Sequence, residues 1–375
     1  MVNSLKVALV HDYLFEQGGA ENVFAVMAEI FPDAPIYTAI YNPHTVAPIF
    51  REREVHTSFL QHITTDKRKA KALLPLYPAA FARMKLRGYD LVLSSSSSFA
   101  KGIDVGDARH VCYCYSPPHF LWQTDRYIEQ VRQPVRRAAI HLATGPLRGR
   151  DRRDADNVDT FIAISDLVRE RIRRIYGRDA AVIYPPINVA EFHLAETVEP
   201  YYLVVSRLLP YKRVDIVIEA CNRLGLPLVV VGDGPDRARL DALAGPTVTM
   251  RGRLQRSEVV EVMARCRALV FPGEEDFGLT PLEAMASGRP VIAYRAGGAL
   301  ETVVEGVTGA FFDAPTTKAV VEVLQDFDAS RYTPSTLRAH AATFDLKRFT
   351  DRLSEVLTGP TTLPCRRGLL SQQSV

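Results

Sequence analysis

The chain lacks a hydrophobic run long enough to cross a membrane, and its cysteines lack a zinc-binding pattern. No apolar stretch in its 375 residues approaches the ~20 residues of a membrane-spanning helix, and the N-terminal apolar run is too short for a signal peptide. The five cysteines include Cys112 and Cys114, whose spacing puts both side chains on one strand face and differs from the C-x2-C spacing of zinc sites. We interpret them as reduced core thiols of a cytoplasmic protein.

The sequence also lacks two common nucleotide-binding motifs. No GxGxxG follows the first strand-like run and no GxxxxGK[ST] occurs, so dinucleotide-binding and P-loop proteins have little support. A D-x-D occurs at Asp154 and Asp156, a pattern that some transferases use to bind a metal-diphosphate complex. It lies in a charged helical stretch far from any strand end, and we interpret it as a solvated face. We therefore expect no metal and no cofactor.

Charge is nearly balanced overall but unevenly distributed. The net charge of +3 is too small to indicate a nucleic-acid partner. Clustered cations beside apolar residues can rest on an anionic bilayer, and a solvated basic face explains them equally well. We expect a cytoplasmic protein, with peripheral contact at the inner face of the cell membrane as one of these two interpretations. The clusters are Lys67, Arg68, Lys69 and Lys71, before the apolar Leu73–Tyr77, and Arg132, Arg136, Arg137, Arg148, Arg150, Arg152 and Arg153.

The length and the repeated pattern predict two α/β domains. A chain of 375 residues exceeds one typical core, and strand-like runs alternate with helical patterns in both halves, as in parallel sheets covered by helices. A stiff Tyr184-Pro185-Pro186 connector separates the halves. The predicted domains are residues 1–186 and 187–344, followed by helices at about 345–358 and a disordered tail at 359–375. Strands are predicted at 7–10, 36–41, 91–94, 111–115 and 161–164, then at 202–205, 228–231, 248–251, 268–271 and 291–294.

The stretch Phe271–Thr302 is the most informative part of the chain. Glu275 and Glu283 stand eight residues apart, with a Phe-Gly turn and a helix start between them. Thr280 suits the N-cap and Pro281 the first helical position. The N–H groups at such a helix start favour a phosphate, and a carboxylate one turn later can reach a ribose. Alternatively, Thr280 and Glu283 form a capping box with a purely structural role.

Other candidate residues stand directly after strands. Arg207 and Lys212 follow the first strand of the second half, where a guanidinium can fork onto phosphate oxygens and an ammonium can supply a point charge. Gly18 and Gly19 precede a helix in the first half, where the backbone can approach a bound anion closely. A solvated loop for the basic pair and a plain turn for the glycines remain open alternatives.

Phe271–Thr302 resembles the donor-sugar signature of the retaining glycosyltransferases of family 4, which have the GT-B fold. The resemblance extends from Val7 to about Leu357. It implies two Rossmann-like doubly wound domains that face a central cleft, an N-terminal one for the acceptor and a C-terminal one for the nucleotide-sugar donor. Terminal helices would cross back to the first domain.

The resemblance also implies roles for individual residues. Glu275 would contact the sugar and Glu283 the ribose, and Ser206–Arg213 resembles the segment whose arginine and lysine bind the donor diphosphate. Gly297 and Gly298 would abut the sugar. Glu275, Arg207 and Lys212 are thus the expected catalytic residues on the donor side. The implied donor contacts are Gly18, Gly19, Arg207, Lys212, Gly232, Arg253, Leu254, Glu275, Phe277, Gly278, Leu279, Thr280 and Glu283.

On the acceptor side the chain departs from the family pattern. Relatives carry a histidine in an H-[ST]-P motif, but here Tyr115 precedes Ser116-Pro117, and His119 appears four residues later. Either His119 replaces the missing histidine in space or Tyr115 donates the hydrogen bond instead. His11 and Asp12, at the end of the first strand, could also face the acceptor.

The resemblance is greatest to the bacterial exopolysaccharide and O-antigen mannosyltransferases. It implies a retaining, metal-independent hexosyltransferase that moves mannose from GDP-mannose to a polysaccharide or lipid-linked oligosaccharide, in exopolysaccharide or lipopolysaccharide biosynthesis. A UDP-sugar-dependent GT-B transferase of glucose, galactose or N-acetylhexosamine is an alternative. A catalytically silent GT-B binding subunit is an alternative of another class.

Overall fold

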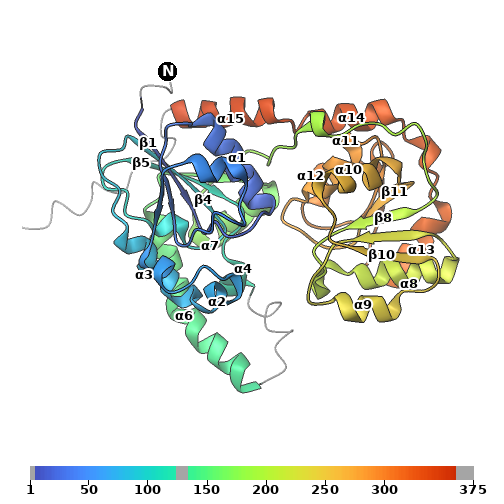
Figure 1. Ribbon diagram of the computed structural model, residues 1–375, viewed down its shortest axis with the longest axis horizontal. Coiled ribbons are helices and arrows are strands. Elements are labelled where there is room, and N and C mark those ends of the chain that lie inside the picture. The colour runs from blue at the N-terminus through green and yellow to red at the C-terminus, as the bar shows by residue number, and fades with distance from the viewer. Residues whose placement is uncertain (1–4, 124–133, 360–375) are drawn as a thin grey trace, which may run out of the picture. The chain divides into compact units, whose positions relative to one another are not determined.

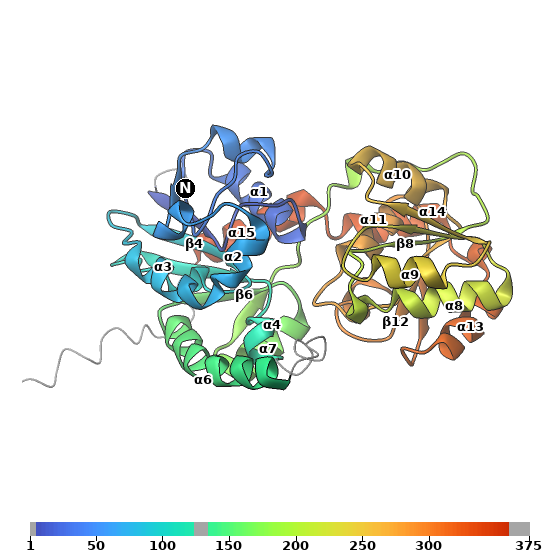
Figure 2. The same cartoon turned by 60° about the horizontal axis from the view of Figure 1, so that its bottom comes forward.

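Two parallel sheets organise the chain, one in each of two units (Figures 1 and 2). The computed structural model describes residues 5–123 and 134–359. The first unit comprises Met1–Ile183 and Thr350–Val375, and the second comprises Tyr184–Phe349. The chain thus passes from one unit to the other just before the Pro185-Pro186 connector. The tail predicted to be disordered lies outside the described residues, apart from Gly359.

The first sheet has the order β3-β2-β1-β4-β5-β6-β7 in the described part of the chain, with every pair parallel. Its central strands β1 and β4 are buried along their whole length, as expected of strands covered on both faces. On β1, Ala8 and Val10 join a core cluster with Phe81 of helix α3, whereas His11 stacks on Phe24 of helix α1 at 4.6 Å. The strands are β1 (Val7–His11), β2 (Ile36–Thr38), β3 (Val55–Thr57), β4 (Leu91–Ser96), β5 (Arg109–Cys114), β6 (Thr160–Ala163) and β7 (Ala180–Val182).

Helices connect these strands and a late helix returns to them. The side chain of Arg109 on β5 donates to the carbonyl oxygens of Val356, Leu357 and Gly359, at 2.9–3.0 Å. These carbonyls at the end of helix α15 would otherwise lack partners, so the predicted return of the terminal helices to the first domain is confirmed. The helices are α1 (Gly19–Ile30), α2 (Lys67–Ala72), α3 (Tyr77–Arg83), α4 (His119–Trp122), α6 (Pro134–Asp156), α7 (Asp166–Tyr176) and α15 (Leu346–Thr358), with 3-10 turns η2 (Pro48–Glu52), η3 (Phe59–His62), η4 (Leu74–Leu76) and η5 (Ala100–Gly102).

The second sheet has the order β10-β9-β8-β11-β12-β13 in the described residues, again parallel throughout. Apolar side chains of β8, β9 and β11 pack with helices α8 and α13 in one buried cluster. The strands are β8 (Tyr202–Val205), β9 (Leu228–Val231), β10 (Val248–Gly252), β11 (Ala268–Phe271), β12 (Val291–Tyr294) and β13 (Gly309–Phe312). The helices are α8 (Val214–Leu224), α9 (Arg237–Leu243), α10 (Arg256–Arg265), α11 (Leu279–Ala286), α12 (Ala299–Thr302), α13 (Thr317–Asp326) and α14 (Pro334–Ala342), with 3-10 turns η6 (Val189–Glu191), η7 (Pro210–Lys212) and η8 (Ala329–Arg331).

All ten predicted strands exist, and three were missed. β3 and β7 have three residues each and are not fully buried. β3 lacks a continuous apolar run. β7 lies in the apolar run from Ala180 to Tyr184, which was not predicted to be a strand. β13 begins with a glycine, which is uncommon in strands. β2 ends at Thr38 instead of continuing to residue 41, and Tyr41 forms only an isolated parallel bridge with Leu14.

Two interpretations from composition have different outcomes. The four described cysteines are buried and form no disulfide, as predicted. The interpretation of the D-x-D as solvated is wrong for Asp154, which is 2% exposed and accepts a hydrogen bond from Nε of Arg150. Burial raises the pKa of this carboxyl.

No helix in the described ranges is long and apolar enough to span a bilayer.

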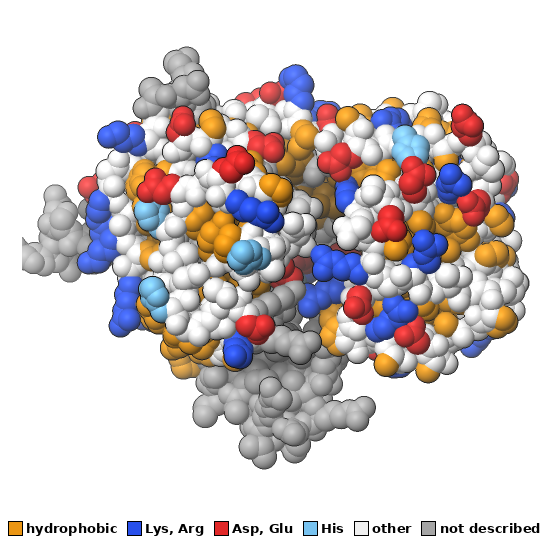
Figure 3. All heavy atoms as spheres, in the orientation of Figure 1, with side chains coloured by type: hydrophobic (Ala, Val, Ile, Leu, Met, Phe, Trp, Pro, Cys, Tyr) orange, Lys and Arg blue, Asp and Glu red, His pale blue; other side chains and the backbone are white. Residues whose placement is uncertain are grey.

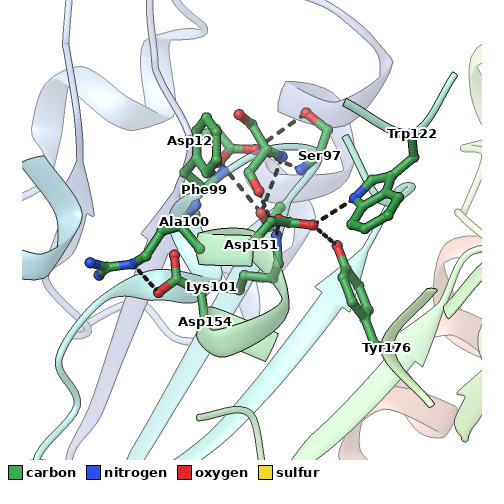
Figure 4. Close-up of polar contacts among 12 residues, drawn as sticks. Asp12, Ser97, Phe99, Ala100, Lys101, Trp122, Asp151, Asp154 and Tyr176 are labelled. Carbon is green, nitrogen blue, oxygen red and sulfur yellow. Dashed lines mark hydrogen bonds and ion pairs between the residues drawn. The ribbon is translucent and has the colours of Figure 1, made fainter. Parts of the chain in front are cut away.

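A buried polar network fixes helix α6 to the end of β4 (Figure 4). Lys101 of η5 and Asp151 of α6 form an ion pair in which both side chains are almost completely buried. The other carboxylate oxygen of Asp151 accepts from Nε1 of Trp122 at 2.7 Å and from the hydroxyl of Tyr176 at 2.8 Å. Burial opposes the charge on Lys101, but the Asp151 carboxylate outweighs it and holds the pKa of Lys101 above its usual value. The network therefore ties α4, α6 and α7 to one point.

A second buried carboxylate holds the loop that leads to this network. Asp12, at the end of β1, accepts hydrogen bonds from the backbone N–H groups of Ser97, Phe99 and Ala100, at 2.6–2.9 Å (Figure 4). It is 1% exposed. Asp12 thus satisfies backbone donors that have no strand partner, and its carboxylate is committed to shaping the chain between β4 and η5.

We predict that Asp151→Ala destabilises the first unit by about 3–5 kcal/mol, because it leaves the Lys101 ammonium buried without its partner. Urea unfolding followed by fluorescence measures this directly, since Trp122 is the one tryptophan of the chain and contacts Asp151. Asp156→Ala, at an exposed position of the same helix, is the matched control and should shift stability by less than about 0.5 kcal/mol. Equal stability of the two variants would contradict this account.

Candidate functional site

The carboxyl ends of β8 and β11 form the point of the second sheet at which strand order reverses. The chain continues from β8 to β9 on one side and from β11 to β12 on the other, and ligands of open α/β sheets bind at such points. The loop after β8 carries Arg207 and Lys212, and the loop after β11 carries Glu275. The topology therefore brings together three of the predicted site residues.

Lys212 and Glu275 form an ion pair at this point. The Lys212 side chain is only 12% exposed and that of Glu275 is 27% exposed. Burial alone would lower the pKa of Lys212, but the adjacent Glu275 carboxylate outweighs burial and keeps the pKa above its usual value. The ammonium therefore remains charged at neutral pH, beside a carboxylate that faces partly into solvent.

Arg207 supplies a second cation with no competing anion. It is exposed, and within the described residues its guanidinium forms no hydrogen bond or ion pair. Arg213, by contrast, has a left-handed backbone with φ +52° and donates to Asp215 and to the carbonyl oxygen of Pro315. Of these two arginines, Arg207 is therefore the one available to an anionic ligand.

Two glycines after β9 allow the loop of Arg207 to pack against them. A Cβ on Gly232, which has φ +137°, would lie 1.8 Å from the carbonyl oxygen of Ser206, and a Cβ on Gly234 would lie 2.2 Å from that of Leu208. No side chain fits at such distances. Gly232, one of the implied donor contacts, thus lies against the neighbouring backbone in the structure.

A second glycine pair supports the loop of Glu275 in the same way. A Cβ on Gly297 would lie 2.4 Å from the carbonyl oxygen of Glu275, and one on Gly298 would lie 2.2 Å from Cα of Phe277. The N–H of Gly298 also donates to the carbonyl oxygen of Glu275 at 2.8 Å. These glycines, predicted to abut the sugar, hold the backbone of the carboxylate-bearing loop.

The start of helix α11 differs from the prediction. Thr280 is not the N-cap: the helix begins at Leu279, and Gly278 precedes it with φ +86° and no side-chain cap. A Cβ on Gly278 would lie 2.8 Å from the ring of Phe271, so the position requires glycine for space as well as for φ. The sequence suggested a hydroxyl cap because it did not reveal this left-handed turn.

Glu283 makes an ion pair instead of closing a capping box. Its Oε1 accepts from Nη1 of Arg256 at 2.7 Å, and the helix start has no side-chain cap hydrogen bond. The purely structural alternative for Glu283 is therefore wrong in its predicted form. Arg256 was missed, because a contact between the first residue of α10 and a side chain of α11 has no signal in the sequence.

The remaining donor-side residues differ in accessibility. The ring of Phe277 is buried and stacks on Tyr184 at 5.3 Å, with Phe344 at 6.0 Å, so only its backbone is left for a ligand. Arg253 is exposed and Leu254 is half-buried, between β10 and α10. The N–H of Gly232 donates to the carbonyl oxygen of Gly252 at 2.7 Å, which links this segment to the end of β9.

In the first unit, the polar residues at the corresponding edge bond to one another. The hydroxyl of Tyr115 donates to the carbonyl oxygen of Ala20 at 2.8 Å and accepts from Oγ of Ser95 at 2.9 Å. Nδ1 of His11 lies 3.0 Å from the same Ser95 oxygen, and burial raises the pKa of Tyr115 well above its usual value. His119 is exposed at the start of α4. The structure thus joins Tyr115 to His11 and leaves His119 on a separate element.

The glycine loop of the first unit is next to a carboxylate of its own chain. Gly18 is the N-cap of α1, and a Cβ there would lie 2.7 Å from Oε2 of Glu21. The other oxygen of Glu21 lies 3.9 Å from Nε2 of His11. Glu21 therefore occupies the positive end of the α1 dipole, and a phosphate bound at Gly18 and Gly19 would lie beside this carboxylate.

Part of the chain resembles a known family. Residues 189–342, all within the second unit, match the family model described as Glycosyl transferases group 1. The second unit is therefore similar to a glycosyl transferases group 1 domain. In the described part of the chain, no group of three or more histidine, cysteine, aspartate and glutamate side chains is arranged to hold a metal ion.

Curated proteins to which the chain is similar include mannosyltransferases. The GDP-mannose-dependent alpha-mannosyltransferase of Mycolicibacterium smegmatis is 33% identical over 240 residues, which cover 61% of this chain and 62% of that protein. The GDP-mannose-dependent alpha-(1-6)-phosphatidylinositol monomannoside mannosyltransferase of Mycobacterium tuberculosis is 30% identical over 215 residues, 47% of this chain and 55% of that protein. The chain thus spans less than two thirds of the length of these curated relatives.

Solved structures agree in fold across both units. Sucrose-phosphate synthase from Thermosynechococcus elongatus has a TM-score of 0.71 at 19% identity and covers 94% of this chain and 98% of its own. HepE of Anabaena, in complex with UDP-glucose, has a TM-score of 0.68 at 18% identity and covers 94% of this chain and 99% of its own. The predicted fold class, two Rossmann-like units as in GT-B glycosyltransferases, is confirmed.

Proposed function

We propose that this protein is a retaining glycosyltransferase of the family 4 type, which transfers mannose from GDP-mannose to a polysaccharide or lipid-linked oligosaccharide. The observation that carries the proposal is the cluster of Arg207, Lys212 and Glu275 at the carboxyl ends of β8 and β11. GDP-mannose as donor is supported by the names of two relatives that are 33% and 30% identical. The acceptor would belong to exopolysaccharide or lipopolysaccharide biosynthesis.

The cations suit the departure of a diphosphate. When the bond between the anomeric carbon and the phosphate oxygen breaks, positive charge develops on the sugar and negative charge on the leaving group. Arg207 and Lys212 would stabilise that negative charge without a metal ion. The N–H groups at the uncapped start of α11 carry partial positive charge, which also favours an anion. The acceptor hydroxyl would attack on the face from which the phosphate leaves, and its proton would pass to that phosphate.

The carboxylates suit the neutral parts of the donor. Glu275 would accept hydrogen bonds from sugar hydroxyls, and Glu283 would accept them from the ribose. In the structure Glu275 forms an ion pair with the Lys212 ammonium. Donor binding would therefore exchange partners: the diphosphate would pair with Lys212, and the sugar hydroxyls would bond to Glu275 in its place. The acceptor-side residue remains a choice between Tyr115, whose hydroxyl is already engaged, and the exposed His119.

We expect Arg207→Ala and Lys212→Ala each to lower the turnover number by about a hundredfold or more, because each removes a cation from the leaving group. Release of nucleotide is followed with GDP-mannose and a panel of UDP-sugars, with excess EDTA present throughout. Arg223→Ala, at an exposed position of α8, is the control. Undiminished turnover in either variant would contradict the assignment of Arg207 and Lys212 to the diphosphate. A strict requirement for a metal would contradict the metal-free mechanism. Turnover with UDP-sugars and not with GDP-mannose would show that the donor is a UDP-sugar.

The exchange of partners at Lys212 predicts the direction in which GDP affinity changes when Glu275 is replaced. We expect Glu275→Gln to bind GDP roughly threefold to tenfold more tightly than the wild type, because the ammonium is no longer shared with a carboxylate. The same variant should lose most of its turnover, since the sugar hydroxyls lose the charged carboxylate to which they donate. Calorimetric titration with GDP gives the affinity, and Glu261→Gln on the surface of α10 is the control. Weaker GDP binding by Glu275→Gln would rule out the exchange.

We further propose that the first unit touches an anionic membrane from the cytoplasmic side. Leu76 is 43% exposed and Ile63 is 55% exposed, on either side of the basic helix α2, and apolar side chains beside cations suit a lipid surface. Figure 3 shows hydrophobic and basic side chains at the surface of this unit. Within the basic clusters, Arg132 lies outside the described residues, and the side chains of Lys67, Arg68, Lys71, Arg136 and Arg137 are not described.

We expect the protein to sediment with vesicles that contain anionic lipid and Leu76→Asp to do so less, because the substitution removes an apolar contact and adds a repelled charge. Leu300→Asp is the matched control, since Leu300 is 54% exposed on the second unit. The contact is refuted by a wild-type protein that stays in the supernatant, or by equal losses in the two variants.

A further inference from the structure

Arg256 lies between two carboxylates, one of which is the proposed ribose ligand. Its Nη1 donates to Oε1 of Glu283 at 2.7 Å. Its Nε and Nη2 donate to Oε2 of Glu191 at 3.3 and 3.2 Å. Arg256 is the first residue of α10 and follows Arg253 and Leu254, two of the implied donor contacts. Because it contacts the proposed ribose ligand, Arg256 lies at the nucleoside end of the proposed donor site.

The guanidinium is held on more than one side, although the residue is half-exposed. It lies over the ring of Phe192 at 5.0 Å from the centroid, a cation–π arrangement that fixes its plane. The carbonyl oxygens of Val189 and Phe192 accept from the guanidinium of Arg338 on α14, at 3.1 and 2.9 Å, which anchors the segment that carries Glu191. Arg256 thus has one preferred position, set by the 3-10 turn η6 and the residue after it.

We call the contacts of Arg256 with Glu283, Glu191 and Phe192 the clamp. The clamp leaves one carboxylate oxygen of Glu283 for a ligand. Oε1 is engaged by Arg256, whereas Oε2 accepts no hydrogen bond within the described ranges. The Glu283 side chain is 15% exposed, so it is held close to the protein with part of its surface open to solvent. A carboxylate whose rotamer is fixed in this way meets a diol without losing further side-chain entropy.

The charge of Arg256 favours a positioning role over competition with the ligand. An uncompensated Glu283 carboxylate would repel the diphosphate of the donor, and the repulsion would grow as water leaves the site. With Arg256 paired to it, Glu283 can accept hydroxyl hydrogens while the donor's negative charge is bound nearby. A guanidinium that merely blocked the site would gain nothing from its second carboxylate and its aromatic support.

We propose that Arg256 is a positioning residue that orients Glu283 toward the ribose hydroxyls and thereby sets the preference of this site for ribonucleotides over deoxyribonucleotides. The inference rests on the proposed function, because it takes Glu283 as the ribose ligand. It adds to that function a role for Arg256 and a preference for ribose over deoxyribose, neither of which donor binding alone requires.

The test compares ribose with deoxyribose at constant base and phosphate. Calorimetry of the full chain gives the dissociation constants of GDP and 2′-deoxy-GDP, and of UDP and 2′-deoxy-UDP. The wild type should favour the ribonucleotide by about tenfold to a hundredfold, the strength of a hydrogen bond to a charged acceptor. Arg256→Gln should weaken binding of the ribonucleotide by about tenfold and leave binding of the deoxyribonucleotide nearly unchanged, so that the preference falls by about tenfold.

Four further variants separate positioning from loss of structure. Arg265→Gln, on the same helix with exposed partners Glu199 and Glu261, is the matched control and should keep the wild-type ratio. Glu191→Gln, which loosens the clamp but retains Arg256, should lower the ratio by a smaller factor. Arg256→Gln combined with Glu283→Gln should be no less selective than Glu283→Gln alone, because the two residues act through one contact.

Each contrary outcome identifies what has failed. A wild type that binds no nucleoside diphosphate overturns the proposed function, and this inference with it. If Glu283→Gln loses the ribose preference while Arg256→Gln and Glu191→Gln both retain it, only the role of Arg256 is overturned. The role is likewise overturned by tighter GDP binding in Arg256→Gln, which would make Arg256 a competitor, and by equal loss of both nucleotides.

Discussion

The donor-side site depends on the close approach of neighbouring loops at the carboxyl ends of β8 and β11. Parallel strands place these loops at one edge of the sheet, but ordinary side chains between them would keep the backbones apart. Gly232 and Gly234 remove that obstacle beside the loop of Arg207, and Gly297 and Gly298 remove it beside the loop of Glu275. Lys212 can pair with Glu275 because both loops are held in this way. The glycines thus determine where the charges lie, although they carry no charge themselves.

Both carboxylates of the proposed site are paired with cations. Glu275 is paired with Lys212, and Glu283 is paired with Arg256, which also pairs with Glu191. The exposed Arg207 has no such partner in the described part of the chain. A site of this kind avoids the cost of burying unpaired carboxylates. Such pairing would allow the proposed diphosphate to bind next to two glutamates.

The sequence predicted the buried parts of the fold well, because a short continuous apolar run bounded by turn residues is typical of a strand covered on both faces. β8, β9, β11 and β12 begin and end where their runs do, whereas β3 is a short, partly exposed strand without such a run. The motifs singled out Arg207, Lys212, Glu275 and Glu283, but they did not indicate the ion pairs of Lys212 with Glu275 and of Arg256 with Glu283. The Thr280 cap was wrong because a left-handed Gly278 starts the helix, and Arg256 was missed because its contact joins two helices.

The two units treat polar groups at their sheet edges in opposite ways. In the first unit, Asp12 is saturated by backbone N–H groups, and Tyr115 bonds to Ser95 and to the backbone of Ala20. Networks that are satisfied internally rigidify a domain, and a ligand gains little by replacing bonds already made. In the second unit, Arg207 and one oxygen of Glu283 have no partner among the described residues. Since a polar group gains most from a ligand when it has no internal partner, Arg207 and Glu283 are better suited than Asp12 and Tyr115 to contact the proposed donor.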